Sequence, residues 1–371
     1  MSKKRRHYRR RPSIKQIVAI VVFLAMVLSQ GSTVLSSLMM GTSETKQTVY
    51  QSGMPEAETG NIVVSNSLDD STGSEATGTS NTETTSRGND SSANVNADAV
   101  TTTSSAGSME VHFIDVGQGD ATLVECDGEY MLIDAGQNDQ GLVLWDYLQE
   151  QGATHLKYAI GTHPDADHIG GLDVILYRCD VDTVIMPDVE NDTKTYDDVI
   201  QTMESKSLTR TDPVVGDVYT LGSATFTIVA PNKDYGTDDM NDWSVGILLQ
   251  NGDDRFLLIG DAETEAEDDI VANGIDISAD VYKVAHHGSN TGTTDSLLTA
   301  VNPTYAVISC GKDNSYGHPH GSVLNKLKNA GVQVFRTDEQ GTIIAYSSGN
   351  GITWNTDPST TWQAGTYSGS K

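Results

Sequence analysis

The sequence contains few cysteines and, beyond its first fifteen residues, few cationic side chains. Its three cysteines, Cys126, Cys179 and Cys310, are too few and odd in number for the disulfide framework of an exported protein, so we expect them to be buried apolar residues. Only 15 of the 23 lysines and arginines follow residue 15, against all 51 acidic residues, which leaves a net charge of about −36 there. This charge argues against a passive nucleic-acid-binding protein, which needs a basic surface.

The N-terminus combines a basic segment with an apolar one. Eight lysines and arginines crowd residues 1–16, and no acidic residue occurs before Glu44. Residues 17–40 carry no charge and begin with twelve consecutive apolar residues, so this segment can nearly or fully cross a bilayer. The preceding basic cluster predicts that the remainder lies outside the cytoplasm. A cleaved signal peptide has the same two regions, so a membrane anchor and a secreted protein both stay open.

Composition then divides the remaining chain into three parts. Residues 41–108 consist largely of Ser, Thr, Asn, Gly and Glu, and they contain too few apolar side chains to offset the entropy of ordering. They are predicted to be a disordered linker. We expect a folded domain over residues 109–350 and a C-terminal tail over residues 351–371.

Within the expected domain, short strand-like runs alternate with helical ones. Strands are predicted at residues 111–116, 121–125, 130–133, 158–160, 183–186, 224–229, 245–249, 256–259, 280–284, 304–309, 333–336 and 341–347. Helices are predicted at residues 142–151, 170–177, 196–205, 263–272, 295–301 and 320–329. This order favours a layered α/β arrangement of two sheets covered by helices.

The densest group of reactive side chains occupies residues 162–171, between a predicted strand and a predicted helix. Two histidines and two aspartates lie close together there: His163, Asp165, Asp167 and His168. Imidazole together with carboxylate is a ligand set for Zn, Mn or Fe. A polar helix N-terminus would explain the aspartates, which the helix dipole favours, but not the two histidines. The segment therefore predicts a metal site.

Three further clusters place polar side chains directly after apolar strands. They are Asp134, Asp261 and the pair His286-His287. A strand-ending aspartate is by itself more often a helix cap than a ligand. Together with the first motif, however, the three clusters supply enough groups for two divalent ions, which can generate a nucleophilic hydroxide and stabilise a leaving oxygen.

The ordered set of motifs resembles the metallo-β-lactamase superfamily and, within it, the hydrolase domain of ComEC-type DNA-uptake proteins. The matching segments are Phe113–Ala121, Leu132–Asp134, His163–His168, Gly260–Glu263, His286–Ser289 and Tyr316–Pro319. The resemblance implies an αββα sandwich with a metal site at one edge of the sheets.

The same resemblance implies a role for each matched residue. It assigns His163 and Asp165 to one ion, Asp167 and His168 to the other, and Asp261 to a bridge between them. One of His286 and His287 would complete the second site, and the sequence leaves open which. Asp134 would orient the ligands from behind. Asp167, Asp134 and His318 are the candidate catalytic residues.

The chain departs from the wider superfamily at two points. Asp165 stands where the usual first motif has a second histidine, and no histidine occurs between His168 and His286, so one further ligand is missing. The segment Asn241–Ser244 resembles an Asn-x-x-Ser element of ComEC-type domains and lies in that gap. An extra carboxylate and fewer imidazoles shift the preference of the first site from Zn toward Mn. We expect two divalent ions, Mn or Zn, although occupancy by one ion stays open.

Other polar residues have two interpretations each. Residues 118–120 either shape the rim of the site or form a hairpin turn, and His318 either donates a proton or contacts phosphate at the site, or lies on the surface. We expect structural roles for His112, His155 and His320.

The function that these features favour is hydrolysis of a phosphodiester by metal-activated water, in an extracytoplasmic enzyme with no obligate protein partner. DNA is the candidate substrate that the resemblance implies. A phosphorylcholine-esterase-like hydrolase, or another ester hydrolase acting on surface polymers, is the alternative of the same fold. A non-catalytic binding module that has lost its metals is the alternative of another class.

Overall fold

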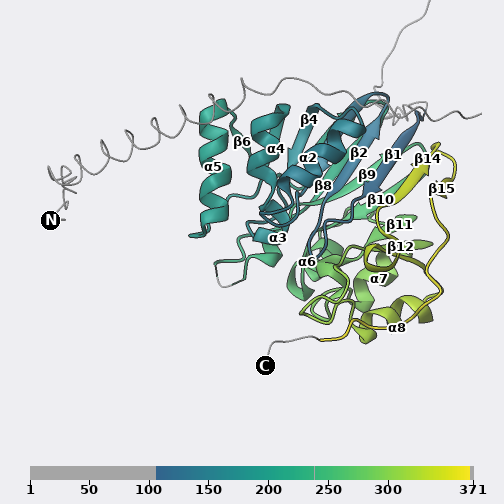
Figure 1. Ribbon diagram of the computed structural model, residues 1–371. Coiled ribbons are helices and arrows are strands. Elements are labelled where there is room, and N and C mark those ends of the chain that lie inside the picture. Colours follow the sequence, from purple (N-terminus) through teal and green to yellow (C-terminus); the bar gives the residue numbers. More distant parts are fainter. Residues whose placement is uncertain (1–105, 238, 368–371) are drawn as a thin grey trace, which may run out of the picture. The chain divides into compact units, whose positions relative to one another are not determined.

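Two β-sheets form the centre of the computed structural model, which describes residues 106–237 and 239–367 (Figure 1). The first sheet has the spatial order β15-β14-β1-β2-β3-β4-β5-β6. Its strands are β1 (Met109–Phe113), β2 (Thr122–Cys126), β3 (Glu129–Ile133), β4 (His155–Ile160), β5 (Asp180–Ile185), β6 (Arg210–Thr211), β14 (Ile343–Ser347) and β15 (Ile352–Trp354). The second has the order β13-β12-β11-β10-β9-β8-β7. Its strands are β7 (Val218–Leu221), β8 (Ala224–Ala230), β9 (Gly246–Asn251), β10 (Asp254–Leu258), β11 (Val281–Lys283), β12 (Tyr305–Ile308) and β13 (Gln333–Arg336).

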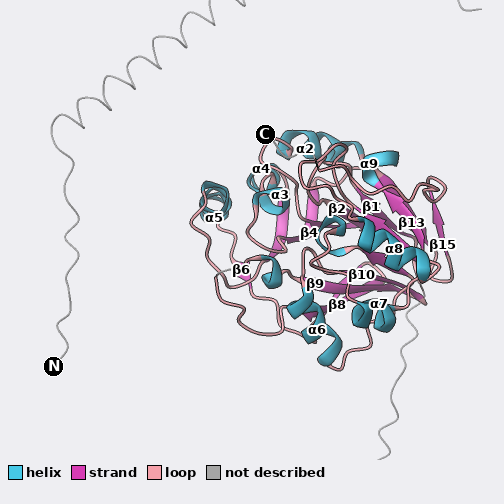
Figure 2. Ribbon diagram, turned by 90° about the horizontal axis from the view of Figure 1, so that it is seen from below, coloured by secondary structure: helices cyan, strands magenta, loops and turns pink. Residues whose placement is uncertain are grey.

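Helices cover the outer face of each sheet. On the first sheet lie α2 (Gly141–Glu150), α4 (Leu172–Arg178) and α5 (Lys194–Lys206), and on the second lie α6 (Thr264–Ala272), α7 (Asp295–Val301) and α8 (Gly321–Asn329). The short helices α3 (Ala166–Ile169), α9 (Thr337–Gln340), η1 (Asn241–Trp243) and η2 (Ala285–Gly288) lie in the connections. Figure 2 shows α2 and α4 on one side of the strands and α6 and α7 on the other. The arrangement confirms the predicted α/β sandwich of two helix-covered sheets.

Side-chain alternation along the strands explains why both faces of each sheet are buried. In β10, Phe256 and Leu258 point between the sheets, whereas Leu257 points toward the helices of the second layer. In β3, Ile133 points between the sheets and Leu132 points toward the helices of the first layer. The apolar side chains form three clusters, one between the sheets and one beneath each helical layer. Both faces of each sheet are therefore apolar and buried.

Parallel pairing brings several strand ends to one edge of the sandwich. β3 and β4 are parallel neighbours in the first sheet, and β10 and β11 are parallel neighbours in the second. The loops that follow parallel strands leave a sheet at the same edge. The segments after these four strands therefore meet, and they are the segments that carry the predicted metal ligands.

The folded domain extends further toward the C-terminus than the predicted boundary at residue 350. Ile352–Trp354 forms β15, and the Trp354 ring stacks on Phe335 with 4.1 Å between ring centroids. Beyond it, Arg336 donates a hydrogen bond to the Gln363 carbonyl at 2.7 Å, and the Gly365 amide donates to the Pro319 carbonyl at 3.0 Å. The predicted tail is therefore wrong for residues 351–365, which the sequence alone could not assign because a three-residue strand leaves almost no periodic pattern.

The end of the predicted linker also contacts the domain. The Gly107 amide donates to Asn251 Oδ1 at 3.2 Å, and Asn251 Nδ2 donates to the Gly107 carbonyl at 2.9 Å. The linker prediction therefore needs a correction at residues 107 and 108. Residues 41–105 of that linker and the apolar segment 17–40 lie outside the described residues. Within the described ranges, no helix has the length and hydropathy that a membrane span requires.

The remaining differences from the predicted elements concern short segments. Seven elements were not predicted, and none is longer than four residues: β6, β7, β15, α3, α9, η1 and η2. The cysteine prediction is confirmed, because Cys126, Cys179 and Cys310 are all buried and unpaired. Burial raises the pKa of the Cys179 thiol to about 12, as expected for an unreactive core residue.

Candidate metal centre

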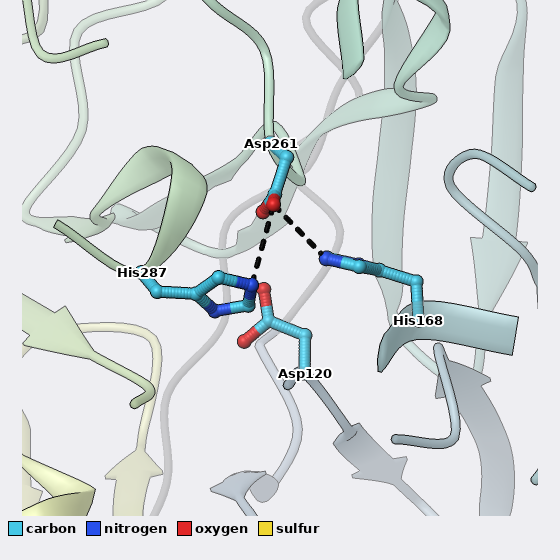
Figure 3. A group of neighbouring side chains, drawn as sticks. All are labelled: Asp120, His168, Asp261 and His287. Carbon is cyan, nitrogen blue, oxygen red and sulfur yellow. Dashed lines mark ion pairs between the residues drawn. The ribbon is translucent and has the colours of Figure 1, made fainter. Parts of the chain in front are cut away.

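Four buried side chains from four loops meet at the edge where the parallel strands end. Asp120 comes from the β1–β2 loop, His168 from α3, Asp261 from the segment after β10, and His287 from η2 (Figure 3). One potential ligand atom of each lies within 4.8 Å of the others. Asp261 Oδ2 lies 3.2 Å from Nε2 of His168 and 3.2 Å from Nε2 of His287. Residues far apart in the sequence thus form one group of candidate metal ligands.

The hydrogen-bond pattern of these side chains fits a metal ion. The Nε2 atoms of His168 and His287 are within ion-pair distance of Asp261, yet neither is aligned for a hydrogen bond with it. Buried atoms without a hydrogen-bond partner among the described residues include Nε2 of His163, His168 and His287 and Oδ1 of Asp120 and Asp261. Buried polar atoms are rarely left unpaired, so this convergence of imidazole nitrogens and carboxylate oxygens matches a divalent cation.

Each histidine of the site is held through its other ring nitrogen. His168 Nδ1 lies 2.8 Å from Asp134 Oδ2, and His287 Nδ1 lies 3.0 Å from the Ser309 carbonyl, which can only accept. His163 Nδ1 lies 3.2 Å from Ser244 Oγ. These contacts turn all three Nε2 atoms toward the site, as the partners of metal-bound histidines do.

Asp134 is buried and contacts the Nδ1 side of His168. It is 1% exposed, and Thr162 donates to it through the backbone amide at 2.9 Å and the hydroxyl at 2.8 Å. With His168 Nδ1 at 2.8 Å, its two oxygens are fully engaged. Asp134 can therefore orient His168 but does not reach the open side of the site.

The rest of the first motif lies around the same group. His163 is fully buried with its ring centroid 4.1 Å from that of His168, and its Nε2 lies 3.9 Å from Asp165 Oδ2. Asp167 Oδ2 lies 3.4 Å from His287 Nε2. The side chains of Asp165 and Asp167 are 43% and 23% exposed. The two aspartates thus form the solvent-facing side of the site.

The adjacent residues His286 and His287 have different surroundings. Both have positive φ, 49° and 54°, which turns the chain sharply and points the rings in different directions. His287 is 1% exposed and belongs to the buried group. His286 is 21% exposed, its Nδ1 lies 3.0 Å from Glu263 Oε1, and its Nε2 lies 3.7 Å from Asp261 Oδ2. The geometry therefore favours His287 over His286 as the ligand that the sequence left unassigned.

His318 lies inside the site region, so the surface alternative for this residue is wrong. It is 5% exposed, and its ring centroid lies 5.7 Å from that of His286 and 6.1 Å from that of His287. Burial and the neighbouring histidines lower the pKa of His318 to about 3. A neutral ring with an Nδ1 that has no partner within the described structure thus borders the centre.

The other predicted histidines and the Asn-x-x-Ser segment have supporting positions. His112 Nδ1 lies 2.8 Å from the Tyr147 hydroxyl, and His155 pairs with Asp182 on the surface. His320 is the residue before α8 and accepts a hydrogen bond from the Asn290 amide through Nδ1. None of the three belongs to the group of candidate ligands. Ser244 accepts from the Asp261 amide at 3.0 Å while it contacts His163. The segment therefore fills the gap left by the missing histidine as a support for two proposed ligands.

The sequence did not predict Asp120 as a metal ligand. It also did not single out Lys283, the ion-pair partner of Asp120. Residues 114–121 connect the antiparallel strands β1 and β2, as the hairpin interpretation of residues 118–120 expected. The same loop brings Asp120 to the site, as the rim interpretation expected. Gly119 has φ 149°, and a Cβ there would lie 2.4 Å from the Asp167 carbonyl, to which the Asp120 amide donates at 3.0 Å. The glycine before Asp120 was the available signal, because only glycine permits this close approach.

Electrostatics within the group predict that metal binding releases protons. Burial lowers the pKa of His287, but Asp261 and Asp167 outweigh it and raise this pKa to about 10. Burial also lowers the pKa of His168, but Asp261 and Asp134 outweigh it and raise this pKa well above its usual value. Burial and the His168 charge lower the pKa of His163 to about 3. Both shifts favour the protonated form of His168 and His287 in the metal-free protein, and a metal ion must displace those protons.

We expect up to two protons released in total when the site is loaded with metal at pH 7, with affinity still rising between pH 7 and 9. Ordinary imidazoles would show this dependence only near pH 6.5. Calorimetric titration with Mn²⁺ in two buffers of different ionisation enthalpy measures the proton number. Equal heats in both buffers at pH 7 would show that these histidines are already neutral.

Comparisons with known proteins show to which sequences this chain is similar. The sequence profile of the metallo-beta-lactamase superfamily matches residues 114–312. ComE operon protein 3 of Bacillus subtilis is 31% identical over 252 residues, which cover 63% of this chain and 32% of that protein. Recombination protein 2 of Haemophilus influenzae is 34% identical over 223 residues, which cover 59% of this chain and 26% of that protein. The chain thus spans about a third or less of the length of these relatives.

Among solved structures, the metallo-beta-lactamase fold protein YhfI of Bacillus subtilis aligns with 62% of this chain and 96% of its own, at a TM-score of 0.41 and 12% identity. The match to the superfamily profile covers more than half of the sequence and contains all four residues of the buried group. The sequence relatives confirm the resemblance to ComEC-type proteins. This chain belongs to the metallo-beta-lactamase superfamily.

Proposed function

We propose that this protein is an extracytoplasmic, metal-dependent phosphodiesterase that cleaves nucleic acid. The superfamily has a hydrolase fold, and the candidate metal group gives this chain the means for hydrolysis. The observation that carries the proposal is the convergence of unpaired, buried imidazole and carboxylate atoms from four loops. A fold that had lost its metals would have no reason to retain such costly groups, which speaks against a non-catalytic binding module.

Two groups of side chains would hold two divalent ions. His163 and Asp165 would bind the first, and Asp120, Asp167, His168 and His287 would bind the second. Asp261, which has Oδ2 beside two histidines and Oδ1 unpaired, would be shared between them. When bound, such ions polarise phosphoryl oxygens and lower the pKa of water.

The chain's own residues would position the substrate and move the proton. Asp167 is partly exposed at the mouth of the site beside His287, so it is the carboxylate placed to accept a proton from an incoming water. His318, with its unpaired Nδ1 beside His286, is placed to contact a phosphate oxygen. Asp134 holds the His168 ring in place and would act only through it.

Nucleic acid is the proposed substrate because of the relatives and the site chemistry together. The relatives carry the names ComE operon protein 3, Recombination protein 2 and Competence protein ComA. Competence and recombination are processes that act on DNA. The acidic surface would repel a polyanion, so binding would depend on the metal centre itself and would weaken when metal is removed. The basic and apolar N-terminal segments support membrane anchoring or secretion.

The test is hydrolysis by the purified full-length chain in detergent, supplied with Mn²⁺ or Zn²⁺. We expect cleavage of single-stranded DNA and of bis(p-nitrophenyl) phosphate, with both activities lost in EDTA. p-Nitrophenyl phosphorylcholine and a chromogenic lactam serve as competing substrates. Hydrolysis of phosphorylcholine ester without DNA cleavage would favour action on surface polymers, and lactam hydrolysis alone would refute a phosphodiesterase.

A further inference from the structure

Lys283 is a buried cation directly behind the candidate metal centre. It is the last residue of β11, 3% exposed, and its Nζ lies 2.8 Å from Asp120 Oδ2 and 3.4 Å from the Val284 carbonyl. Lysine is almost never fully buried, and desolvating an ion pair costs several kcal/mol per ion. An apolar residue would serve a core strand better. The position therefore calls for a role beyond packing.

The partner of Lys283 belongs to the candidate metal group. Asp120 Oδ2 is held by Lys283, whereas Asp120 Oδ1 is buried without a hydrogen-bond partner in the described ranges. A ligand oxygen of Asp120 lies within 4.8 Å of the ligand atoms of His168, Asp261 and His287. One carboxylate thus connects a fixed ammonium group to the place where a divalent ion would bind.

Lys283 reaches Asp120 from the interior of the sandwich. Both residues line a small cavity between the sheets, together with Asp134 and Thr162. Substrate would approach from the other side, where Asp165 and Asp167 are exposed. Lys283 is therefore poorly placed to bind a phosphate and well placed to act through Asp120.

We infer that Lys283 is a positioning residue that acts on the metal through Asp120. Its ammonium group holds one oxygen of Asp120 and leaves the other as a metal ligand. The same positive charge competes with the bound ion for Asp120. The inference rests on the proposed metal centre but not on its substrate. In the metal-free protein, Lys283 neutralises part of the charge of the buried carboxylates. In the loaded protein, its positive charge weakens the hold on a divalent ion.

Lys283→Met, close in length but uncharged, tests the inference in the full-length chain. We expect Mn²⁺ to bind at least about tenfold more tightly, because Asp120 gains a free oxygen and a repelling charge is gone. The metal-free variant should melt at a lower temperature than the wild type, and saturating Mn²⁺ should raise its melting temperature by more than it raises that of the wild type. A purely structural ion pair predicts the opposite, because a misplaced Asp120 would weaken Mn²⁺ binding.

Asp120→Asn and the double variant Asp120→Asn/Lys283→Met provide the matched controls. Asp120→Asn should bind Mn²⁺ at least tenfold more weakly and leave Lys283 without its counter-ion. The double variant should melt at a higher temperature than Asp120→Asn without regaining affinity. If Lys283→Met does not fold, with or without Mn²⁺, the comparison of the double variant with Asp120→Asn tests the inference. A double variant that is no more stable than Asp120→Asn overturns it.

Calorimetric affinity and melting temperature separate this inference from the proposed function. Unchanged or weaker Mn²⁺ binding by folded Lys283→Met, or wild-type affinity in Asp120→Asn, would overturn the inference. A wild-type chain that binds neither Mn²⁺ nor Zn²⁺ would overturn it together with the metal centre. Intact metal binding without DNA cleavage would overturn only the proposed substrate.

Discussion

Asp261→Asn is expected to remove bound metal and to lower hydrolysis on the order of 10³-fold or more, since metal centres contribute several kcal/mol to catalysis. Asp261 is 2% exposed, and its Oδ2 lies 3.2 Å from Nε2 of both His168 and His287. The histidine charges outweigh burial and hold the pKa of Asp261 well below its usual range. A neutral amide of the same shape therefore loses the charge that both proposed ions share.

Asp165→Asn is the matched control for this substitution. The Asp165 side chain is 43% exposed, and its Oδ2 lies 3.9 Å from Nε2 of the candidate ligand His163. Water can fill a vacancy there, so excess Mn²⁺ should restore a large part of the activity. The measurement is activity together with bound metal for both variants across a Mn²⁺ titration. Rescue of Asp261→Asn with failure of Asp165→Asn would place the shared ligand at Asp165 instead.

His287→Ala is expected to cause a loss of similar size, about 10³-fold, with most of the bound metal gone. The neighbouring variant His286→Ala should lose about ten- to a hundredfold, the range typical of residues that support a ligand. His287 belongs to the buried group, whereas His286 contacts Glu263 and Thr291 through Nδ1. Both residues have positive φ, so alanine imposes comparable backbone strain at both positions.

Metal content by mass spectrometry and DNA hydrolysis measure the difference between these two variants. The melting temperature of each protein shows whether the fold survives the substitution. Equal metal content in His287→Ala and wild type would remove His287 from the ligand set. A greater loss of metal in His286→Ala than in His287→Ala would reverse the assignment of the pair.

Local sequence was sufficient for the longer elements and for most of the candidate ligands. Alternation in runs such as residues 224–229 predicted the strands, because buried faces demand apolar side chains at every second position. The concentration of histidine and aspartate in residues 163–168 indicated a metal, because this ligand chemistry requires few residues at short spacing. Short elements such as β6 and β15 escaped prediction, since two or three residues carry no periodicity.

Long-range contacts decided what sequence left open. The choice of His287 over His286 depends on a sharp turn with positive φ at both residues, which no local pattern in the sequence encodes. The inclusion of Asp120 depends on its meeting with Asp261 and His287, which lie far later in the chain. Nearness of residues this far apart is produced only by the packing of one sheet on the other.

The sequence by itself thus determined the superfamily, the order of the elements, and the motifs that carry imidazole and carboxylate groups. Tertiary structure alone decided which atoms of those groups converge, because that depends on parallel strand ends meeting at one edge. It also decided which ring nitrogen of each histidine is free, because Asp134, Ser244 and the Ser309 carbonyl take the other. Ligand identity follows from residue type, but ligand geometry follows from the supporting contacts that fix each side chain.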